Sequence, residues 1–210
     1  MFCITDEKLG ALREHIKSSL SEKRARHILA VENMAVRLGV LYAEGEESER
    51  ILRAAALLHD ITKEKKGDEQ LELCSKYGIT LTPEELCAPK THHARTAAAK
   101  ILKEYPEFAD ENVVSAVRWH TTGRADMSIY EKLIFLADYI DDSRVFPDCV
   151  KLRELFWSAE PEKMSAAERD VHLTNILVLA FDMTIMGLLS DGAVIHPDTV
   201  AARNFLICHK

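Results

Sequence analysis

The sequence predicts an all-α protein folded as one compact helical bundle, and three observations lead to this prediction. Apolar residues recur at a spacing of three or four positions, as they do from Val31 to Leu41. No segment alternates apolar and polar residues between hairpin turns, so a β-sheet has little support. Three capping-box sequences also mark helix starts, at Thr82–Glu85, Ser128–Glu131 and Ser165–Glu168.

The expected helices follow one another between breaks in the apolar pattern. Before the first break, at Gly45, lies the stripe Val31–Leu41, and the next segment carries the apolar run Ala54–Leu58. The breaks divide the chain into about nine to eleven helices of ordinary length. They fall at Gly45, Gly67, Gly78, Pro89, Pro106, Gly123, Pro147, Pro161 and Gly192.

The helices in the second half of the chain are indicated by their starts and their stripes. Proline at position 83 suits the first helical position after the capping residue Thr82. No linker rich in glycine, serine or proline separates these helices from the earlier ones, so we expect a single domain over residues 1–210. The stripes are Ala97 and Ile101; Val113, Ala116 and Val117; and Leu133, Ala137 and Ile140.

Charge and cysteine content exclude several functional classes. The 210 residues carry a formal net charge of −7, whereas nucleic acids and anionic membranes are bound by basic surfaces. The longest uninterrupted apolar run, Ile176–Phe181, is far shorter than a membrane span. Five scattered cysteines without a C-x-x-C pair argue against a zinc ribbon or a disulfide framework. We therefore expect a soluble cytoplasmic protein that binds neither nucleic acid nor membrane.

Several ionisable residues lie on stripes that should face the core. Each histidine alone reads most simply as a hydrogen-bonded core residue, and Asp138 alone could pair with a buried arginine. Together they come from separate apolar helices, and burying so many unpaired polar groups is expensive. One shared divalent cation would satisfy them. The residues are His27, His59, Asp60, His93, His120 and Asp138.

The order His27, His59-Asp60, Asp138 resembles the ligand order of the HD-domain metal-dependent phosphohydrolases. Longer strings resemble one bacterial subfamily, the symmetrical bis(5′-nucleosyl)-tetraphosphatases, which cleave diadenosine tetraphosphate into two ADP. The resemblance covers about residues 21–206 and implies a single compact HD-domain helical bundle. The strings are H-D-I-T-K at 59–63, H-A-R-T-A-A at 93–98, W-H-T-T-G-R at 119–124, A-D-Y-I at 137–140, S-R-V-F-P at 143–147 and H-P-D-T-V-A-A-R-N at 196–204.

Two positions depart from the subfamily pattern or leave a choice within it. Asp141-Asp142 stands where the subfamily has an acidic residue followed by proline, which leaves the geometry of that turn open. Of the adjacent histidines, the motif and the helical phase select His93, and we expect His92 to face solvent.

The resemblance implies a first set of metal ligands made of His27, His59, Asp60 and Asp138. Imidazole and carboxylate ligands suit iron, manganese, cobalt or zinc, and iron is the usual ion of the family. Asp60 or Asp138 would orient the attacking water as catalytic residues. His93 and His120 would bind phosphate, protonate the leaving oxygen, or serve as ligands of a further ion.

Three more residues are candidate phosphate ligands. Lys63 lies one helical turn after His59 if that helix continues, although it could equally be a solvated charge. Arg144 follows the Asp138 helix, where its guanidinium could hold a phosphate through two hydrogen bonds. Thr121 lies in the break after His120, which could also be an ordinary helix stop.

Other functions share parts of this pattern. A nucleoside monophosphatase or a guanosine polyphosphate hydrolase of the HD type would keep the metal ligands, and a nucleotide-sensing protein would bind without turnover. The sequence leaves open the choice between adenine and guanine, whether one or two ions bind, and whether the protein forms a homodimer. No base-binding slot is evident, since Phe156 and Trp157 read as core residues.

Overall fold

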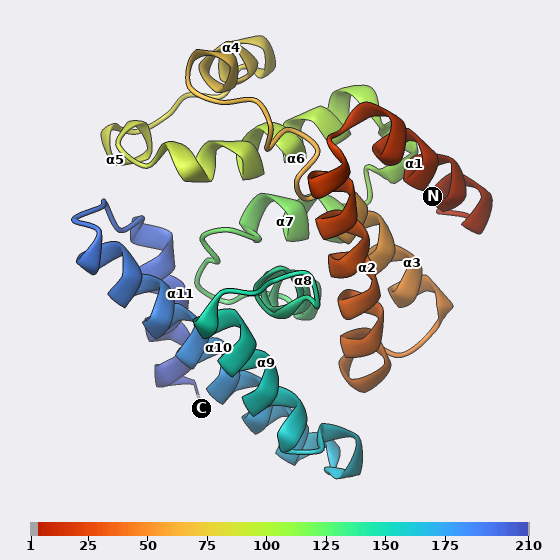
Figure 1. Cartoon of the computed structure of the whole chain (residues 1–210), viewed down its shortest axis with the longest axis vertical. Helices are drawn as coiled ribbons and strands as arrows, with labels where there is room; N and C mark the ends of the chain where they lie inside the picture. Colours follow the sequence, from red (N-terminus) through yellow and green to blue (C-terminus); the bar gives the residue numbers. More distant parts are fainter. Residues whose placement is uncertain (1–3, 210) are drawn as a thin grey trace.

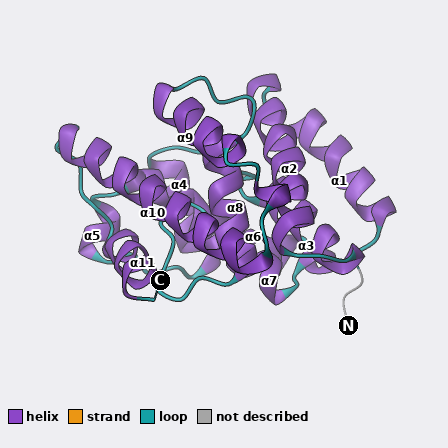
Figure 2. Cartoon of the chain, turned by 90° about the horizontal axis from the view of Figure 1, so that it is seen from below, coloured by secondary structure: helices purple, strands orange, loops and turns teal. Residues whose placement is uncertain are grey.

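The structure, a computed structural model, describes residues 4–209. Over that range it contains α-helices, three single-turn 3₁₀ helices and no strand, which confirms the all-α prediction (Figures 1 and 2). The α-helices are α1 (Asp6–Ser19), α2 (Glu22–Tyr42), α3 (Glu46–Leu58), α4 (Asp68–Tyr77), α5 (Pro83–Leu86), α6 (His92–Glu104), α7 (Glu111–Trp119), α8 (Ile129–Ile140), α9 (Pro147–Ser158), α10 (Ala166–Ser190) and α11 (Pro197–Cys208). The 3₁₀ helices are η1 (Pro89–Thr91), η2 (Pro106–Phe108) and η3 (Pro161–Lys163).

Local sequence signals account for most of these boundaries. The three expected capping boxes are all formed, and they start α5, α8 and α10. Eight of the nine glycine or proline breaks lie at the edge of a helix, and Gly123 lies in the link between α7 and α8. The sequence signals missed the boundary between α1 and α2, where neither glycine nor proline occurs and the Ser21 side chain caps α2 by accepting a hydrogen bond from the Arg24 amide.

Helix α8 is the centre of the packing. It contacts α2, α3, α7, α9 and α10, and Figure 1 shows it nearly end-on in the middle of the molecule. Its side chains from Leu133 to Ala137 are buried, so a carboxylate placed on it enters the interior of the protein. Asp138 lies in the last turn of this helix.

Helix α10 is long and apolar enough to cross a membrane, with a mean hydropathy of 1.7 over its most apolar stretch. Counting only uninterrupted apolar runs had missed this property. A third of that stretch is buried, and the helix packs against α8, α9 and α11. Packing within the bundle therefore accounts for part of its apolar character.

Candidate metal and phosphate site

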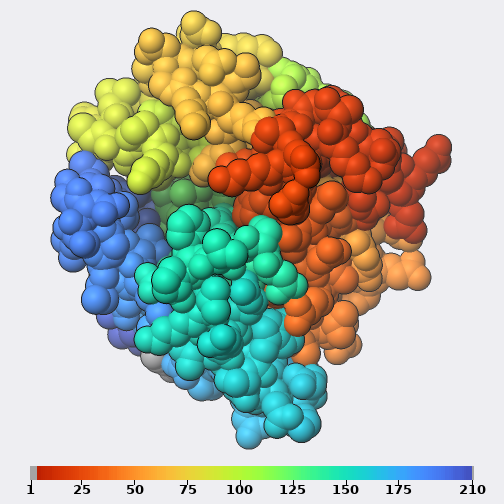
Figure 3. Space-filling model, viewed as in Figure 1, coloured from red at the N-terminus to blue at the C-terminus, as the bar shows by residue number. Residues whose placement is uncertain are grey.

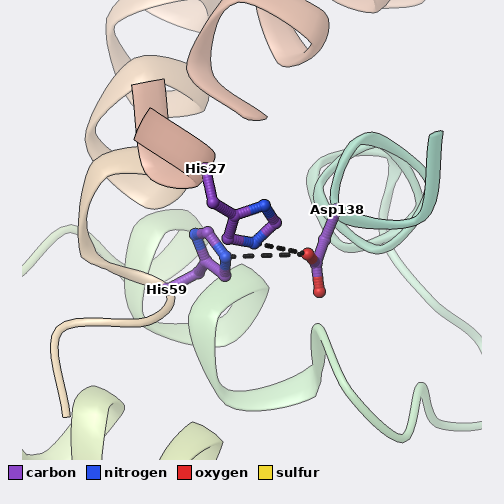
Figure 4. A group of neighbouring side chains, drawn as sticks. All are labelled: His27, His59 and Asp138. Carbon is purple, nitrogen blue, oxygen red and sulfur yellow. Dashed lines mark ion pairs between the residues drawn. The ribbon is translucent and has the colours of Figure 1, made fainter. Parts of the chain in front are cut away.

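The predicted site residues meet because several of them stand at helix ends that face α8. His59 is the residue immediately after α3, and His120 is the residue immediately after α7. His27 projects from the second turn of α2 and His93 from the first turn of α6. Figure 4 shows His27, His59 and Asp138 pointing toward one another from three separate parts of the chain.

The His27 and His59 rings face the Asp138 carboxylate. Oδ1 of Asp138 lies 3.0 Å from Nε2 of His27 and 3.8 Å from Nε2 of His59. These three residues form a group whose ligand atoms all lie within 4.8 Å of one another, as a shared metal ion requires. Three of the four predicted metal ligands are therefore adjacent here, and the fourth, Asp60, adjoins them.

Asp60 is buried and faces histidines on both sides. Its Oδ2 lies 3.7 Å from Nε2 of His27 and 3.6 Å from Nε2 of His59. Its Oδ1 lies 3.2 Å from Nε2 of His93 and 3.6 Å from Nε2 of His120. A second group of candidate ligands is formed by His59, Asp60 and His120. This arrangement suits a carboxylate that bridges two neighbouring cations as well as one that binds a single ion.

Backbone carbonyls select the ring tautomer of two histidines. Nδ1 of His59 lies 2.6 Å from the carbonyl oxygen of Ala56, and Nδ1 of His120 lies 2.7 Å from that of Val117. An Nδ1–H donated to a carbonyl leaves the lone pair on Nε2, which is the nitrogen that faces the carboxylates. Both rings are therefore set up to bind a cation through Nε2.

The electrostatics of the cluster favour neutral His59 and His93 rings and a protonated His27 ring beside charged carboxylates. Burial lowers the pKa of His59 to about 4 and that of His93 to about 3, so both are neutral at pH 7. Burial alone would also lower the pKa of His27, but Asp138 and Asp141 outweigh it and raise the value to about 9. A cation at Nε2 of His27 competes directly with that proton, because it needs the same lone pair.

The residues present fit a divalent transition metal. Nε2 of His27, Nε2 of His59 and Oδ1 of Asp60 are buried, and none of them forms a well-aligned hydrogen bond despite the short distances between them. Polar atoms that converge in this way are the ligands a cation needs, and the nitrogen and oxygen donors suit iron, manganese, cobalt or zinc.

The two adjacent histidines have different surroundings. His93 faces the cluster, with Nε2 3.0 Å from Nε2 of His120. The expectation that His92 faces solvent is wrong: only 3% of it is exposed, and its Nε2 lies 2.7 Å from the carbonyl oxygen of Glu85. The reason is that Glu85 of α5 contacts His92 and η1 packs against α6, so both histidines of its first turn are buried.

Lys63 reaches the cluster by a different route from the one expected. The α3 helix ends at Leu58, and residues 59–64 form successive turns. Lys63 is therefore not on a continuing helix, yet its Nζ lies 3.0 Å from Nε2 of His93. Thr121 is close too, with its hydroxyl 3.1 Å from Nε2 of both His93 and His120.

Arg144 contacts a predicted ligand directly. Its Nε donates to the carbonyl oxygen of Asp138 at 2.8 Å, and its Nη2 forms an ion pair with the Asp138 carboxylate. Although burial raises the pKa of an acid, the Arg144 charge is the main factor that holds the pKa of Asp138 well below its usual range. Arg144 thus fixes the Asp138 carboxylate as well as lying at the edge of the site.

Two residues of this site were not predicted. Asp141 is fully buried after the end of α8, and its Oδ2 lies 3.3 Å from Nδ1 of His27, the nitrogen that faces away from Asp138. Arg24, one helical turn before His27, forms an ion pair with Asp60. The available signal for Asp141 was an acidic residue at the end of an apolar helix. The available signal for Arg24 was its i, i+3 spacing from His27 on one helix.

Two basic pockets flank the cluster. One begins at His93, has a volume of about 340 Å³ and carries Lys63, Lys65, Lys66 and Lys90. The other begins at His27 and has a volume of about 590 Å³. Figure 3 shows the second region on the surface, where red-orange residues at the start of α2 meet teal residues that follow α8. Its lining is Glu22, Lys23, Arg24, Arg26, His27, Ser143, Arg144, Val145 and Phe146.

Comparisons with known proteins agree with this geometry. The chain is 33% identical over 205 residues to the symmetrical bis(5′-nucleosyl)-tetraphosphatase of Halalkalibacterium halodurans, covering 96% of this chain and 98% of the relative. It is 29% identical over 194 residues to the Bacillus subtilis protein of the same name, with 91% and 94% covered.

A solved structure and a family match complete the comparison. A Clostridium acetobutylicum protein described as a "predicted HD superfamily hydrolase involved in NAD metabolism" superposes with a TM-score of 0.80 at 32% identity, covering 96% of this chain and 97% of the other. Residues 24–142, which span His27 to Asp138, match the family described as HD domain. The chain therefore belongs to the HD domain family, among the symmetrical bis(5′-nucleosyl)-tetraphosphatases.

Proposed function

We propose that this enzyme hydrolyses diadenosine tetraphosphate symmetrically into two ADP. The observation that carries the proposal is the position of the His/Asp cluster between two basic pockets, one entered at His93 and the other at His27. A substrate with a nucleotide at each end and the scissile bond at its centre suits that layout. The relatives that cover nearly the whole chain bear the name of this activity.

His27, His59, Asp60 and Asp138 would hold a divalent ion, for which we propose iron; manganese, cobalt and zinc suit the same donors. Such an ion supplies Lewis acidity toward a phosphoryl oxygen and a nucleophilic water at neutral pH. Asp60, His93 and His120 converge closely enough to hold a second ion, and Asp60 would then bridge the two.

The chain's own residues would then perform three tasks. Asp60 or Asp138 accepts a hydrogen bond from the attacking water and aims it at a β-phosphorus. The new bond joins that water oxygen to phosphorus, and the broken bond is the one to the oxygen bridging the two β-phosphoryl groups. His93 donates a hydrogen bond to the departing ADP, and His120, whose Nδ1–H is donated to the Val117 carbonyl, would contribute its Nε2 lone pair as a ligand of the second ion. Lys63, Thr121 and Arg144 bind phosphate oxygens during the step.

Product analysis of diadenosine tetraphosphate hydrolysis by the metal-loaded protein tests the proposal. We expect ADP as the sole nucleotide product, at two per substrate. ATP plus AMP would contradict symmetrical cleavage. Faster release of phosphate from nucleoside monophosphates, or of pyrophosphate from guanosine polyphosphates, would identify another HD-domain hydrolase. Binding without turnover would indicate a nucleotide-sensing protein.

Small soluble nucleotides as substrates, and cysteines without a disulfide pattern, fit a bacterial cytoplasmic location.

A further inference from the structure

The pocket that begins at His27 ends in an exposed apolar rim. Phe146 is 64% exposed and Val145 is 81% exposed, and both line the pocket. They lie in the link between α8 and α9, where the backbone of Phe146 forms the N-cap of α9. The Phe146 side chain is thus held at the edge of the pocket by the start of a helix, without being needed in the core.

Cations line the other end of the same pocket. Arg24 and Arg144 are paired with Asp60 and Asp138 of the cluster, so their guanidinium groups lie next to the proposed metal ligands. Among the described residues Lys23 has no ion pair, and it adds a further positive charge to the lining. The lining therefore carries four cationic side chains, Lys23, Arg24, Arg26 and Arg144, against one carboxylate, Glu22, in a chain with a net charge of −7.

The distance between the two ends is limited by the chain itself. The Ser143 hydroxyl lies 3.4 Å from Nδ1 of His27, which places residue 143 at the cluster. Phe146 follows three residues later, so the backbone can carry it only about 10 Å away from that point. Anionic and aromatic groups a few bonds apart in one ligand would therefore meet both ends of the pocket.

We infer that this pocket is a nucleoside diphosphate subsite in which the base stacks on Phe146. The inference rests on the proposed function, because it assigns one ADP half of the substrate to this pocket. The phosphates lie at the Arg24 and Arg144 end, and the base lies over the exposed phenyl ring. Stacking on an aromatic ring accepts any base, since every base has a π-face.

The pocket on the His93 side is built differently. Its lining consists of four lysines with Gly67, Gln70, Pro89, His92 and His93, and no Phe, Tyr or Trp is among these residues. Cations therefore hold the phosphates of both halves of the substrate, and an aromatic ring is available to the base of one half only. A change at Phe146 should weaken the binding of one nucleoside only.

The test measures ADP and pyrophosphate binding to metal-loaded variants by calorimetry. We expect Phe146→Ala to weaken ADP binding about tenfold, the loss expected for a single base–aromatic stack. Pyrophosphate binding should not change, because pyrophosphate has no base. Phe146→Trp should restore ADP binding, whereas Phe146→Leu, which is apolar but cannot stack, should not. Leu102→Ala, an exposed apolar change on α6 outside both pockets, is the matched control and should bind ADP normally.

The outcomes separate this inference from the proposed function. Unchanged ADP affinity in Phe146→Ala would overturn the subsite, as would an equal loss of ADP and pyrophosphate binding or full recovery in Phe146→Leu. A wild-type protein that binds no ADP would overturn it as well. A wild-type protein that binds ADP through Phe146 but fails to cleave diadenosine tetraphosphate would retain the subsite and contradict only the proposed reaction.

Discussion

Single residues outside the cluster determine which ring nitrogen of each histidine is free to bind a cation. The carbonyl oxygens of Ala56 and Val117 accept hydrogen bonds from the Nδ1–H groups of His59 and His120. The lone pairs of both rings are then on Nε2, which faces Asp60 and Asp138. Asp141 faces Nδ1 of His27 in the same way. Backbone and carboxylate acceptors outside the cluster therefore determine how its histidines can bind a cation.

The adjacent residues His92 and His93 should separate stability from turnover. We expect His93→Ala to lower kcat by about 10²–10⁴-fold, the range for the loss of an acid–base group. His92→Ala removes the hydrogen bond to the Glu85 carbonyl and should lower the free energy of unfolding by about 1–3 kcal/mol, with kcat largely retained. Steady-state kinetics and denaturant unfolding of both variants measure the two effects. An equal loss of turnover in both would show that the structure assigns His93 incorrectly.

Arg144→Lys keeps the charge but cannot donate two directed hydrogen bonds from one planar group. Arg144 contacts both the carbonyl oxygen and the carboxylate of Asp138, so we expect kcat/KM for diadenosine tetraphosphate to fall by about tenfold or more. Arg37→Lys, at an exposed pair with Asp142, is the matched control and should have little effect. Kinetics at matched metal content provide the comparison, and wild-type values for Arg144→Lys would remove Arg144 from the site.

For single residues, the sequence predicted which side chains form the site better than it predicted which residues contact or cover them. Six ionisable residues on apolar stripes were recognised, and all of them meet in one cluster. Arg24 and Asp141, which contact the predicted ligands, were missed, and His92 was expected to face solvent although it is buried. Periodicity identifies which face of a helix is apolar, but it carries no information about which distant segment covers the opposite face.

At the scale of elements, the site is built from the places where helices end. His59 and His120 follow the last residues of α3 and α7, so their rings are held by helix termini rather than by loops. Capping boxes and glycine or proline breaks predicted most boundaries, since these signals are local. The sequence analysis left the end of α3 open because it depends on long-range contacts: Thr62 bonds to Thr96 and to the carbonyl oxygen of His93, which favours turns over a further helical turn.

The turn after His120 depends on the glycine at position 123. Its φ is +64°, and a Cβ there would lie 2.6 Å from Cζ of Phe181. We expect Gly123→Ala to lower the free energy of unfolding by about 2–4 kcal/mol through backbone strain and overpacking. Thermal unfolding should show a fall in Tm of roughly 5–15 °C.

Gly187 provides the matched control for that substitution. It lies within α10, and a Cβ there would have no neighbour within 4 Å. Gly187→Ala should therefore leave Tm unchanged or raise it slightly, because alanine favours the helix. If both variants unfolded at the wild-type temperature, the close packing of Gly123 against Phe181 would be incorrect.

At the scale of the whole molecule, a large apolar core supports a small polar centre. The core runs through helices α1–α3 and α6–α11, so the fold does not depend on a cation. The cluster nevertheless contains buried polar atoms without aligned partners, and a bound ion would compensate for their burial. The bundle itself was predictable from composition and periodicity, whereas the meeting of the ligands at one point was predicted from the cost of burying them and from the resemblance to the HD-domain phosphohydrolases.

Removing the metal should lower stability and leave the helices intact. A ligand present at about 100 times its Kd stabilises the folded state by about 2.7 kcal/mol. For a chain of this length, a chelator should therefore lower Tm by roughly 5–10 °C at unchanged helical circular dichroism. Adding Mn²⁺ back should restore the Tm, and Asp138→Ala should abolish this response. Elemental analysis should show that the chelator-treated sample is metal-free and the untreated sample metal-loaded. Identical Tm values for these two samples would contradict the assigned ligands.

The spread of the ligands along the chain also bears on how the protein is made. His27 lies near one end of the matched region and Asp138 near the other, while α9, α10 and α11 follow and pack around α8. During synthesis the first ligand is therefore available long before the last, and the helices that fix α8 in place emerge later still. The complete centre requires α8 and the helices that pack around it, so we expect metal uptake to be a late event in maturation. The metal content of a preparation would then report the fraction of chains that have reached the native state.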